Sequence, residues 1–165
     1  MKGCFFTICS AVCLATFGAY VVLGIQFNIN CKGHLKRAAD SNTVEMAKKE
    51  LDIAIEYLEK EGLTEGYTSV IYKTPDEDIE FWYSNLKSAS QELAELPNDA
   101  PALEKSNALM KLRETIMDQG EKGERVTAPA GISRYPYNGL LGTLMALSMT
   151  FIFVAYISIN KTMRF

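Results

Sequence analysis

The chain has 165 residues, 48% of them apolar, and a formal net charge of −3 at neutral pH. Two uncharged runs of 29 and 26 residues bracket a middle segment that contains all 20 acidic residues and 14 of the 17 basic ones. This distribution excludes a simple soluble globule, a polybasic nucleic-acid binder and a disordered chain, and it predicts an all-α membrane protein with one domain between two transmembrane helices.

The first predicted element is a transmembrane helix over residues 4–27, after a tail of residues 1–3. A helix of this length measures about 36 Å, which crosses a hydrocarbon core of about 30 Å with some tilt. A cleaved signal peptide is the alternative, because Lys2 precedes the apolar run. We favour the retained helix, since the run is longer than the apolar region of a signal peptide and no Ala-x-Ala cleavage site follows it.

Three of the four cysteines, Cys4, Cys9 and Cys13, lie inside this run, and Cys31 lies just beyond it. The middle segment has no other cysteine, so no internal disulfide framework is expected there. Cys31 either pairs with another chain or stays reduced, and we expect a membrane-impermeant thiol reagent to label it. Cys4 is a candidate for acylation.

Residues 28–138 are predicted to form an extramembrane antiparallel bundle of about three helices, at about 42–61, 75–96 and 100–119. Each helix has apolar residues at intervals of three and four, which is typical of one buried face. These residues are, helix by helix, Val44, Ala47, Leu51, Ala54, Ile55 and Leu58; Ile79, Trp82, Leu86, Ala89, Leu93 and Leu96; and Leu103, Leu109, Met110, Leu112, Ile116 and Met117.

The first two of these helices have signals at their starts. The first begins either at a cap within residues 42–45 or further back, through residues 35–39. The second has Thr74 in the N-cap position, Pro75 at the first helical position and Glu77 where a capping box places its acid.

An aromatic cluster follows in the second helix. Phe81, Trp82 and Tyr83 are consecutive, so their side chains spread over about 200° of the helix surface. Trp82 belongs to the buried face, and Phe81 and Tyr83 then either cover the preceding connection or lie exposed as anchors for a partner. Tyr67 and Tyr72 lie in a β-rich stretch of that connection, which is predicted to be extended and packed on the bundle. We predict a partner contact at Phe81, Tyr83, Tyr67 and Tyr72.

Residues 120–138 contain three glycines and two prolines and are predicted as a linker. The second transmembrane helix is predicted over residues 139–159, followed by a tail of residues 160–165. Lys161 and Arg164 come directly after the apolar run, as in a stop-transfer segment.

Both predicted spans contain small residues at four-residue spacing: Ala11, Ala15 and Ala19 in the first, and Gly142 and Ala146 in the second. Small residues let the backbones of membrane helices approach closely. We expect these stripes to pack the two helices as a hairpin or against a larger membrane complex.

The charge distribution predicts the orientation in the membrane. The middle segment has a net charge of −6 (14 basic and 20 acidic residues) and the two tails together +3, so both termini are expected in the cytoplasm. The domain is then extracytoplasmic, either periplasmic or lumenal. Three basic residues beside the outer end of the first span, Lys32, Lys36 and Arg37, indicate the opposite orientation. We give them less weight, because long loops are translocated across the membrane largely regardless of their charge.

Residues that could support catalysis are scarce. His34 is the single histidine, and the chain has no glycine-rich phosphate loop, nucleophile elbow or metalloprotease pair. The acidic run of residues 76–80 lacks the spacing of a calcium loop and suits the positive end of a helix dipole. We expect no enzymatic activity, no catalytic residue, no cofactor and no metal site.

The arrangement of span, helical domain and span resembles, in architecture alone, the sensing end of bacterial chemoreceptors and sensor kinases. Those proteins continue into a cytoplasmic signalling region, whereas this sequence ends at Phe165, six residues after the second run. We expect a non-enzymatic accessory or scaffold subunit whose partners are the lipid bilayer and other membrane protein subunits, not nucleic acid. The alternative is a ligand-sensing domain that signals through a partner protein.

Overall fold

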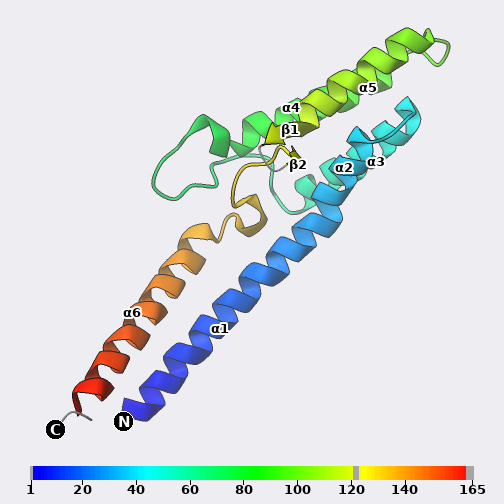
Figure 1. Ribbon diagram of the computed structural model, residues 1–165. Coiled ribbons are helices and arrows are strands. Elements are labelled where there is room, and N and C mark those ends of the chain that lie inside the picture. The colour runs from blue at the N-terminus through cyan, green and yellow to red at the C-terminus, as the bar shows by residue number, and fades with distance from the viewer. Residues whose placement is uncertain (1, 121–122, 163–165) are drawn as a thin grey trace.

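A computed structural model of the chain describes residues 2–120 and 123–162 (Figure 1). Parts of the predicted tails, Met1 and residues 163–165, lie outside the described residues, as do residues 121–122 of the predicted linker. The described chain is mostly helical, as predicted.

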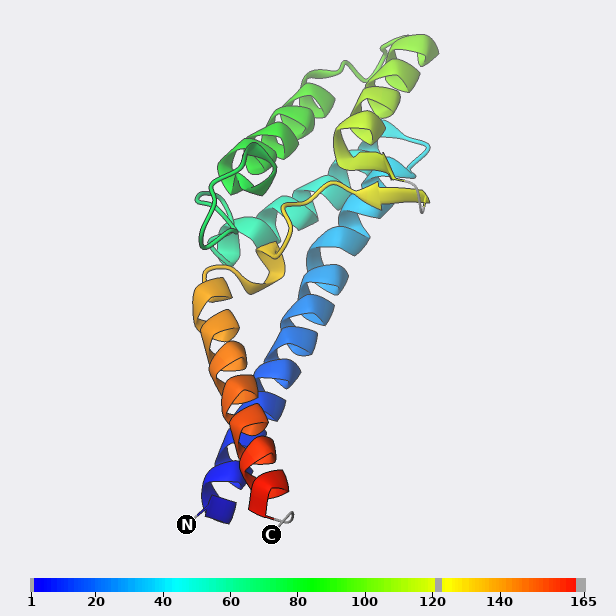
Figure 2. The same cartoon turned by 60° about the vertical axis from the view of Figure 1, so that its left-hand side comes forward.

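Two helices are long and apolar enough to cross a membrane. They are the N-terminal helical stretch, which begins with α1, Lys2–Phe27, and α6, Asn138–Thr162. The two helices lie side by side and antiparallel, with both chain ends together and the rest of the chain at the other end (Figures 1 and 2).

The helical stretch that begins with α1 does not stop at Phe27. One π-helical turn, Asn28–Lys32, joins it to α2, Gly33–Ala39, so that the N-terminal helix enters the domain. Residues 35–39 are helical, but they belong to α2, which residues 40–43 separate from the next helix, so the predicted alternative in which the first bundle helix extends back through them is wrong. The predicted cap is present, because Thr43 Oγ1 accepts a hydrogen bond from Met46 N at the start of the next helix.

The domain contains four packed helices instead of three, since α2 joins the predicted bundle. The other members are α3, Val44–Lys60; α4, Ile79–Glu95; and α5, Ala102–Ile116. Contacts run from α2 to α3, α3 to α4, α4 to α5 and α5 back to α2, which closes a ring around one core.

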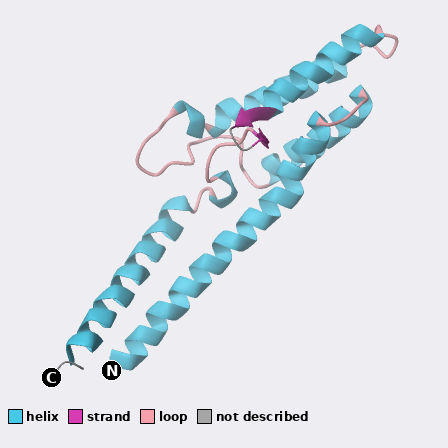
Figure 3. Cartoon of the chain, in the orientation of Figure 1, coloured by secondary structure: helices cyan, strands magenta, loops and turns pink. Residues whose placement is uncertain are grey.

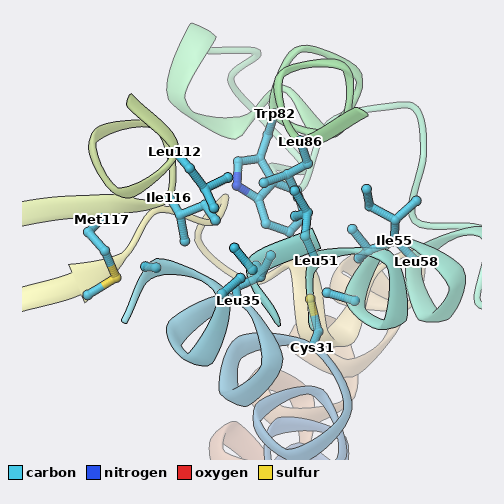
Figure 4. Packing of buried hydrophobic residues seen from close by; sticks show 14 of the residues in the cluster. Cys31, Leu35, Leu51, Ile55, Leu58, Trp82, Leu86, Leu112, Ile116 and Met117 are labelled. Carbon is cyan, nitrogen blue, oxygen red and sulfur yellow. The ribbon is translucent and has the colours of Figure 1, made fainter. Parts of the chain in front are cut away.

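The core follows the predicted apolar faces (Figure 4). Figure 4 shows Cys31 and Leu35 from the N-terminal stretch meeting Leu51 of α3 and Trp82 of α4. On α5 the predicted face is only partly correct: Leu112 and Ile116 are buried, but Leu103 and Met110 are exposed. Leu103 lies in the first turn of α5, at the end of the bundle farthest from α6 (Figure 1).

The second predicted helix begins later than its sequence signals indicate. Residues Pro75–Glu77 form a 3-10 turn, and the N-cap of α4 is Asp78, whose Oδ1 accepts a hydrogen bond from Phe81 N at 3.1 Å. Asp78 is extended because it pairs with Tyr67 as an isolated β-bridge, and Ile79 N donates to Gly66 O at 2.9 Å. Pairing with the preceding connection thus interrupts the helix.

The predicted linker is a packed part of the domain. Strands β1, Met117–Gly120, and β2, Gly123–Val126, form an antiparallel hairpin, with Met117 opposite Val126 (Figure 3). A 3-10 turn, Ile132–Arg134, follows, and the Ile132 side chain is buried in the core. Trp82 Nε1 donates a hydrogen bond to Thr127 O, which fastens this segment to α4.

Candidate interaction surfaces

Phe81, the first predicted anchor, is exposed on α4. It lines an open groove of about 390 Å³ together with Trp82, and the walls of the groove come from the 3-10 turn before α4, from α5 and from residues 127–129. Because Trp82 is held by its bond to Thr127, the groove has a firm floor. An exposed aromatic ring beside a fixed groove is the kind of feature that anchors a protein partner.

Tyr83, the second predicted anchor, faces α3 instead of solvent. Its hydroxyl donates to Glu59 Oε1 at 2.7 Å, and Lys87 Nζ donates to the same oxygen at 2.6 Å. Hydrogen bonds from Lys87 and Tyr83 lower the pKa of the Glu59 carboxyl, while burial and the bond to Glu59 raise the pKa of Tyr83. Tyr83 therefore helps to hold α4 against α3.

Tyr67 and Tyr72 lie in the connection between α3 and α4, and neither lines the groove beside Phe81. The Tyr67 end of the connection is paired with Asp78, as the predicted extended segment requires. Val70, Ile71 and Tyr72 are exposed, so this part does not pack on the bundle as predicted. The structure thus distributes the four predicted contact residues over three places instead of one surface.

Sequence reasoning did not single out Val70 and Ile71 as surface residues. The sequence feature that could have identified them is the stretch from Gly66 to Tyr72, which carries no charge although the domain around it is highly charged. An apolar and uncharged stretch in a loop indicates contact with something other than water.

The contact between α1 and α6 uses residues other than the predicted small ones. Ala11, Ala15 and Ala146 are exposed, Ala19 and Gly142 are half-buried, and a Cβ added at Gly142 would meet no atom within 4 Å. These stripes do not form the hairpin contact, and their packing against another chain stays a prediction.

Buried and half-buried residues at alternating intervals of three and four form the contact instead. They are Cys9, Cys13, Thr16 and Tyr20 on α1, and Leu141, Met145, Ser148 and Ile152 on α6. The two buried hydroxyl groups bond to carbonyls of their own helices: Thr16 Oγ1 to Val12 O at 2.9 Å and Ser148 Oγ to Met145 O at 2.9 Å. They are therefore tolerated in an apolar contact.

Cys31 is fully buried in the domain core. The predicted labelling by a membrane-impermeant reagent is therefore not expected for the folded chain, and neither is a disulfide to another chain. The sequence placed Cys31 just outside the membrane but did not show that the helix around it continues into the bundle.

His34 takes part in an ion-pair cluster at the junction of α2 and α3. Its Nδ1 lies 2.7 Å from Glu50 Oε2, and Arg37 Nη2 lies 2.8 Å from the same oxygen. Burial by itself would raise the pKa of Glu50, but the hydrogen bond from His34 and the charge of Arg37 outweigh it and leave the pKa lowered. The cluster ties the N-terminal helical stretch to α3.

Within the described residues, no group of three or more His, Cys, Asp or Glu side chains is placed to hold a metal ion. Comparisons with protein-family models, with curated proteins and with solved structures found no match to this chain.

Proposed function

We propose that the protein is a membrane-anchored accessory or scaffold subunit without enzymatic activity. In this proposal the apolar parts of α1 and α6 span the bilayer, both termini are cytoplasmic, and the helical domain lies in the periplasm or a lumen. The domain and the helical hairpin dock onto a larger membrane protein complex. The positive tails and the acidic domain support this orientation.

The observation that carries the proposal is the exposed Phe81 ring beside the groove floored by Trp82. Aromatic side chains concentrate binding energy when they sit on a well-packed surface. The ring of four helices and the bond from Trp82 to Thr127 provide that surface.

The alternative, a ligand-sensing domain, predicts an enclosed pocket lined by converging polar groups. Three hollows on the described chain, of about 330–390 Å³, are grooves open to solvent. Open grooves favour docking of a protein segment over enclosure of a small molecule, so the docking role is the better supported of the two.

Docking is tested with Phe81→Ser and a matched control, Leu103→Ser, which removes a similarly exposed apolar side chain at the far end of the bundle. Both variants are expected to insert in the membrane and to melt like the unmodified chain. Phe81→Ser should lose its partner on affinity purification from gently solubilised membranes, because losing an anchor costs about 2 kcal/mol, roughly 30-fold in affinity. Leu103→Ser should retain the partner.

Retention of every partner by folded Phe81→Ser would contradict docking at this groove. The stripe of Ala11, Ala15 and Ala19, of which the first two are exposed, would then be the next surface to vary. Tyr83 is left unchanged in the test because its bond to Glu59 contributes to the fold.

A further inference from the structure

The connection between α3 and α4 reaches the side of the domain from which α6 leaves (Figures 1 and 2). Asn138, the first residue of α6, donates a hydrogen bond from Nδ2 to Thr68 O at 2.6 Å. The methyl groups of Val70 lie 3.5 and 3.6 Å from where a Cβ of Gly139 would be. Residues 68–70 are therefore level with the first turn of α6.

The tip of this connection is apolar and exposed. Val70, Ile71 and Tyr72 are 67%, 82% and 74% exposed, although burying such a side chain is worth about 1.5–3 kcal/mol. Three consecutive exposed side chains of this kind mark a contact surface.

The stem of the connection is fixed by backbone hydrogen bonds. Gly66 has a φ of +97°, a left-handed conformation that suits glycine, and its carbonyl accepts from Ile79 N. Thr68 N donates to Glu77 O at 3.0 Å, and Tyr72 N donates to Ser69 Oγ at 3.2 Å. The apolar tip is therefore presented in a defined position beside α6.

The neighbouring side chains are those that membrane interfaces favour. Tyr137, in the turn before α6, is exposed. Lys73 Nζ lies 5.3 Å from the centre of the Tyr67 ring, and the Arg134 guanidinium lies 4.5 Å from the centre of the Tyr20 ring. Tyrosine and basic side chains accumulate where hydrocarbon meets the lipid head groups.

We infer that Val70, Ile71 and Tyr72 insert into the lipid interface beside the first turn of α6, as a third membrane contact of the chain. The inference rests on the proposed membrane-spanning role of α6. Lipid is the favoured occupant because Val70 packs at Gly139, the residue at which the apolar run of α6 begins. A bilayer that surrounds this run reaches the tip without any further partner.

The test uses the full chain in phosphatidylcholine vesicles whose acyl chains carry bromine, a fluorescence quencher, at a shallow or a deep position. Ile71→Trp and Tyr72→Trp place a reporter at two exposed positions of the tip, and the signal of the native Trp82 is subtracted with the unmodified chain. Leu103→Trp is the control far from the membrane, and Phe153→Trp, exposed on α6, is the control within the proposed span.

We expect both tip reporters to be quenched more by shallow than by deep bromine and to emit at shorter wavelength than Leu103→Trp. Phe153→Trp should be quenched more by deep bromine. If Phe153→Trp is quenched and both tip reporters behave like Leu103→Trp, the tip lies in water or under another protein and the inference is wrong, while the span stands. If Phe153→Trp also escapes quenching, the membrane-spanning role itself fails.

Discussion

Glu50 accepts hydrogen bonds from two side chains that belong to the end of the N-terminal helical stretch, His34 and Arg37. Its side chain is only 18% exposed, so water screens these interactions less than it screens the other ion pairs of the domain. The cluster is a residue-scale link between the apolar stretch and the bundle.

The cluster predicts a pH dependence of stability. The pKa of Glu50 is lower in the folded chain than its ordinary value of 4.5, so its contribution is present above pH 4.5 and is lost as the pH falls through the folded-state pKa. Glu50→Gln should lower the free energy of unfolding by about 1 kcal/mol at pH 7, and the difference should shrink below pH 4.5.

Thermal melting of the full chain in detergent, followed by circular dichroism, measures this effect. Glu56→Gln is the control, because Glu56 is an exposed acid on the same helix. Equal melting curves for Glu50→Gln and the unmodified chain at pH 7 would show that the cluster contributes nothing.

At the scale of elements, Thr74 and Asp78 are both candidates for the N-cap of α4, and the local sequence does not distinguish between them. Asp78 Oδ1 accepts from a backbone N–H of α4, whereas Thr74 Oγ1 donates to the Glu77 side chain within the preceding 3-10 turn. We predict that Asp78→Ala costs about 0.5–2 kcal/mol of stability, that Asp78→Asn costs less, and that Thr74→Ala costs under about 0.5 kcal/mol.

Melting curves of these three variants decide between the two positions. A larger loss for Thr74→Ala than for Asp78→Ala would mean that the helix begins at Pro75, as the sequence signals indicate. The pairing of Tyr67 with Asp78 would then be wrong as well.

The elements that sequence predicted best are those whose signal is repeated over several turns. The apolar positions of α3 and the two uncharged runs each supply many consistent residues, and the helices follow them. The β1–β2 hairpin was not predicted, because each described strand contains a single large apolar residue, Met117 in β1 and Val126 in β2. No alternation of apolar and polar residues is therefore visible.

Other differences come from contacts between distant parts of the chain. The capping pattern at Thr74 is consistent with the local sequence, but it is overridden by the pairing of Asp78 with Tyr67, eleven residues before it. Phe81 and Tyr83 are a second example. Their spacing on the helix directs both side chains away from the core, and only the position of Glu59 on α3 shows that Tyr83 is hydrogen-bonded within the domain. Local periodicity cannot supply such information.

For the whole molecule, the main prediction concerns which side of the membrane holds the domain. Cys31 cannot report this because it is buried, so an exposed position is needed. Leu103→Cys introduces a thiol at a site that is 73% exposed and far from the helical hairpin (Figure 1). A membrane-impermeant maleimide should label this variant in intact cells, above the background of the unmodified chain.

Labelling of Leu103→Cys only after the cells are permeabilised would reverse the proposed orientation. The basic residues beside the outer end of the first span, Lys32, Lys36 and Arg37, would then have determined it. The docking surface at Phe81 would face cytoplasmic partners.

The two long helices differ in how they join the domain. α1 continues through one π-helical turn into α2, and Cys31, Leu35 and Ala38 of this stretch are core residues. α6 is instead reached through an irregular strap, residues 127–137, that is held to the domain by side-chain and backbone hydrogen bonds. α1 is thus continuous with a core helix of the bundle, whereas α6 is connected to the bundle through the strap.

Because of this asymmetry, the rotational orientation of the domain depends on the number of residues in a single helix, α1. One residue inserted near Gly18 would turn the whole bundle by about 100° about the axis of α1 relative to the N-terminal end of that helix, whereas one residue inserted in the strap would be absorbed locally. A partner that twists or tilts the N-terminal end of α1 would move the Phe81 groove along an arc, and the packing of α6 on α1 would limit that movement.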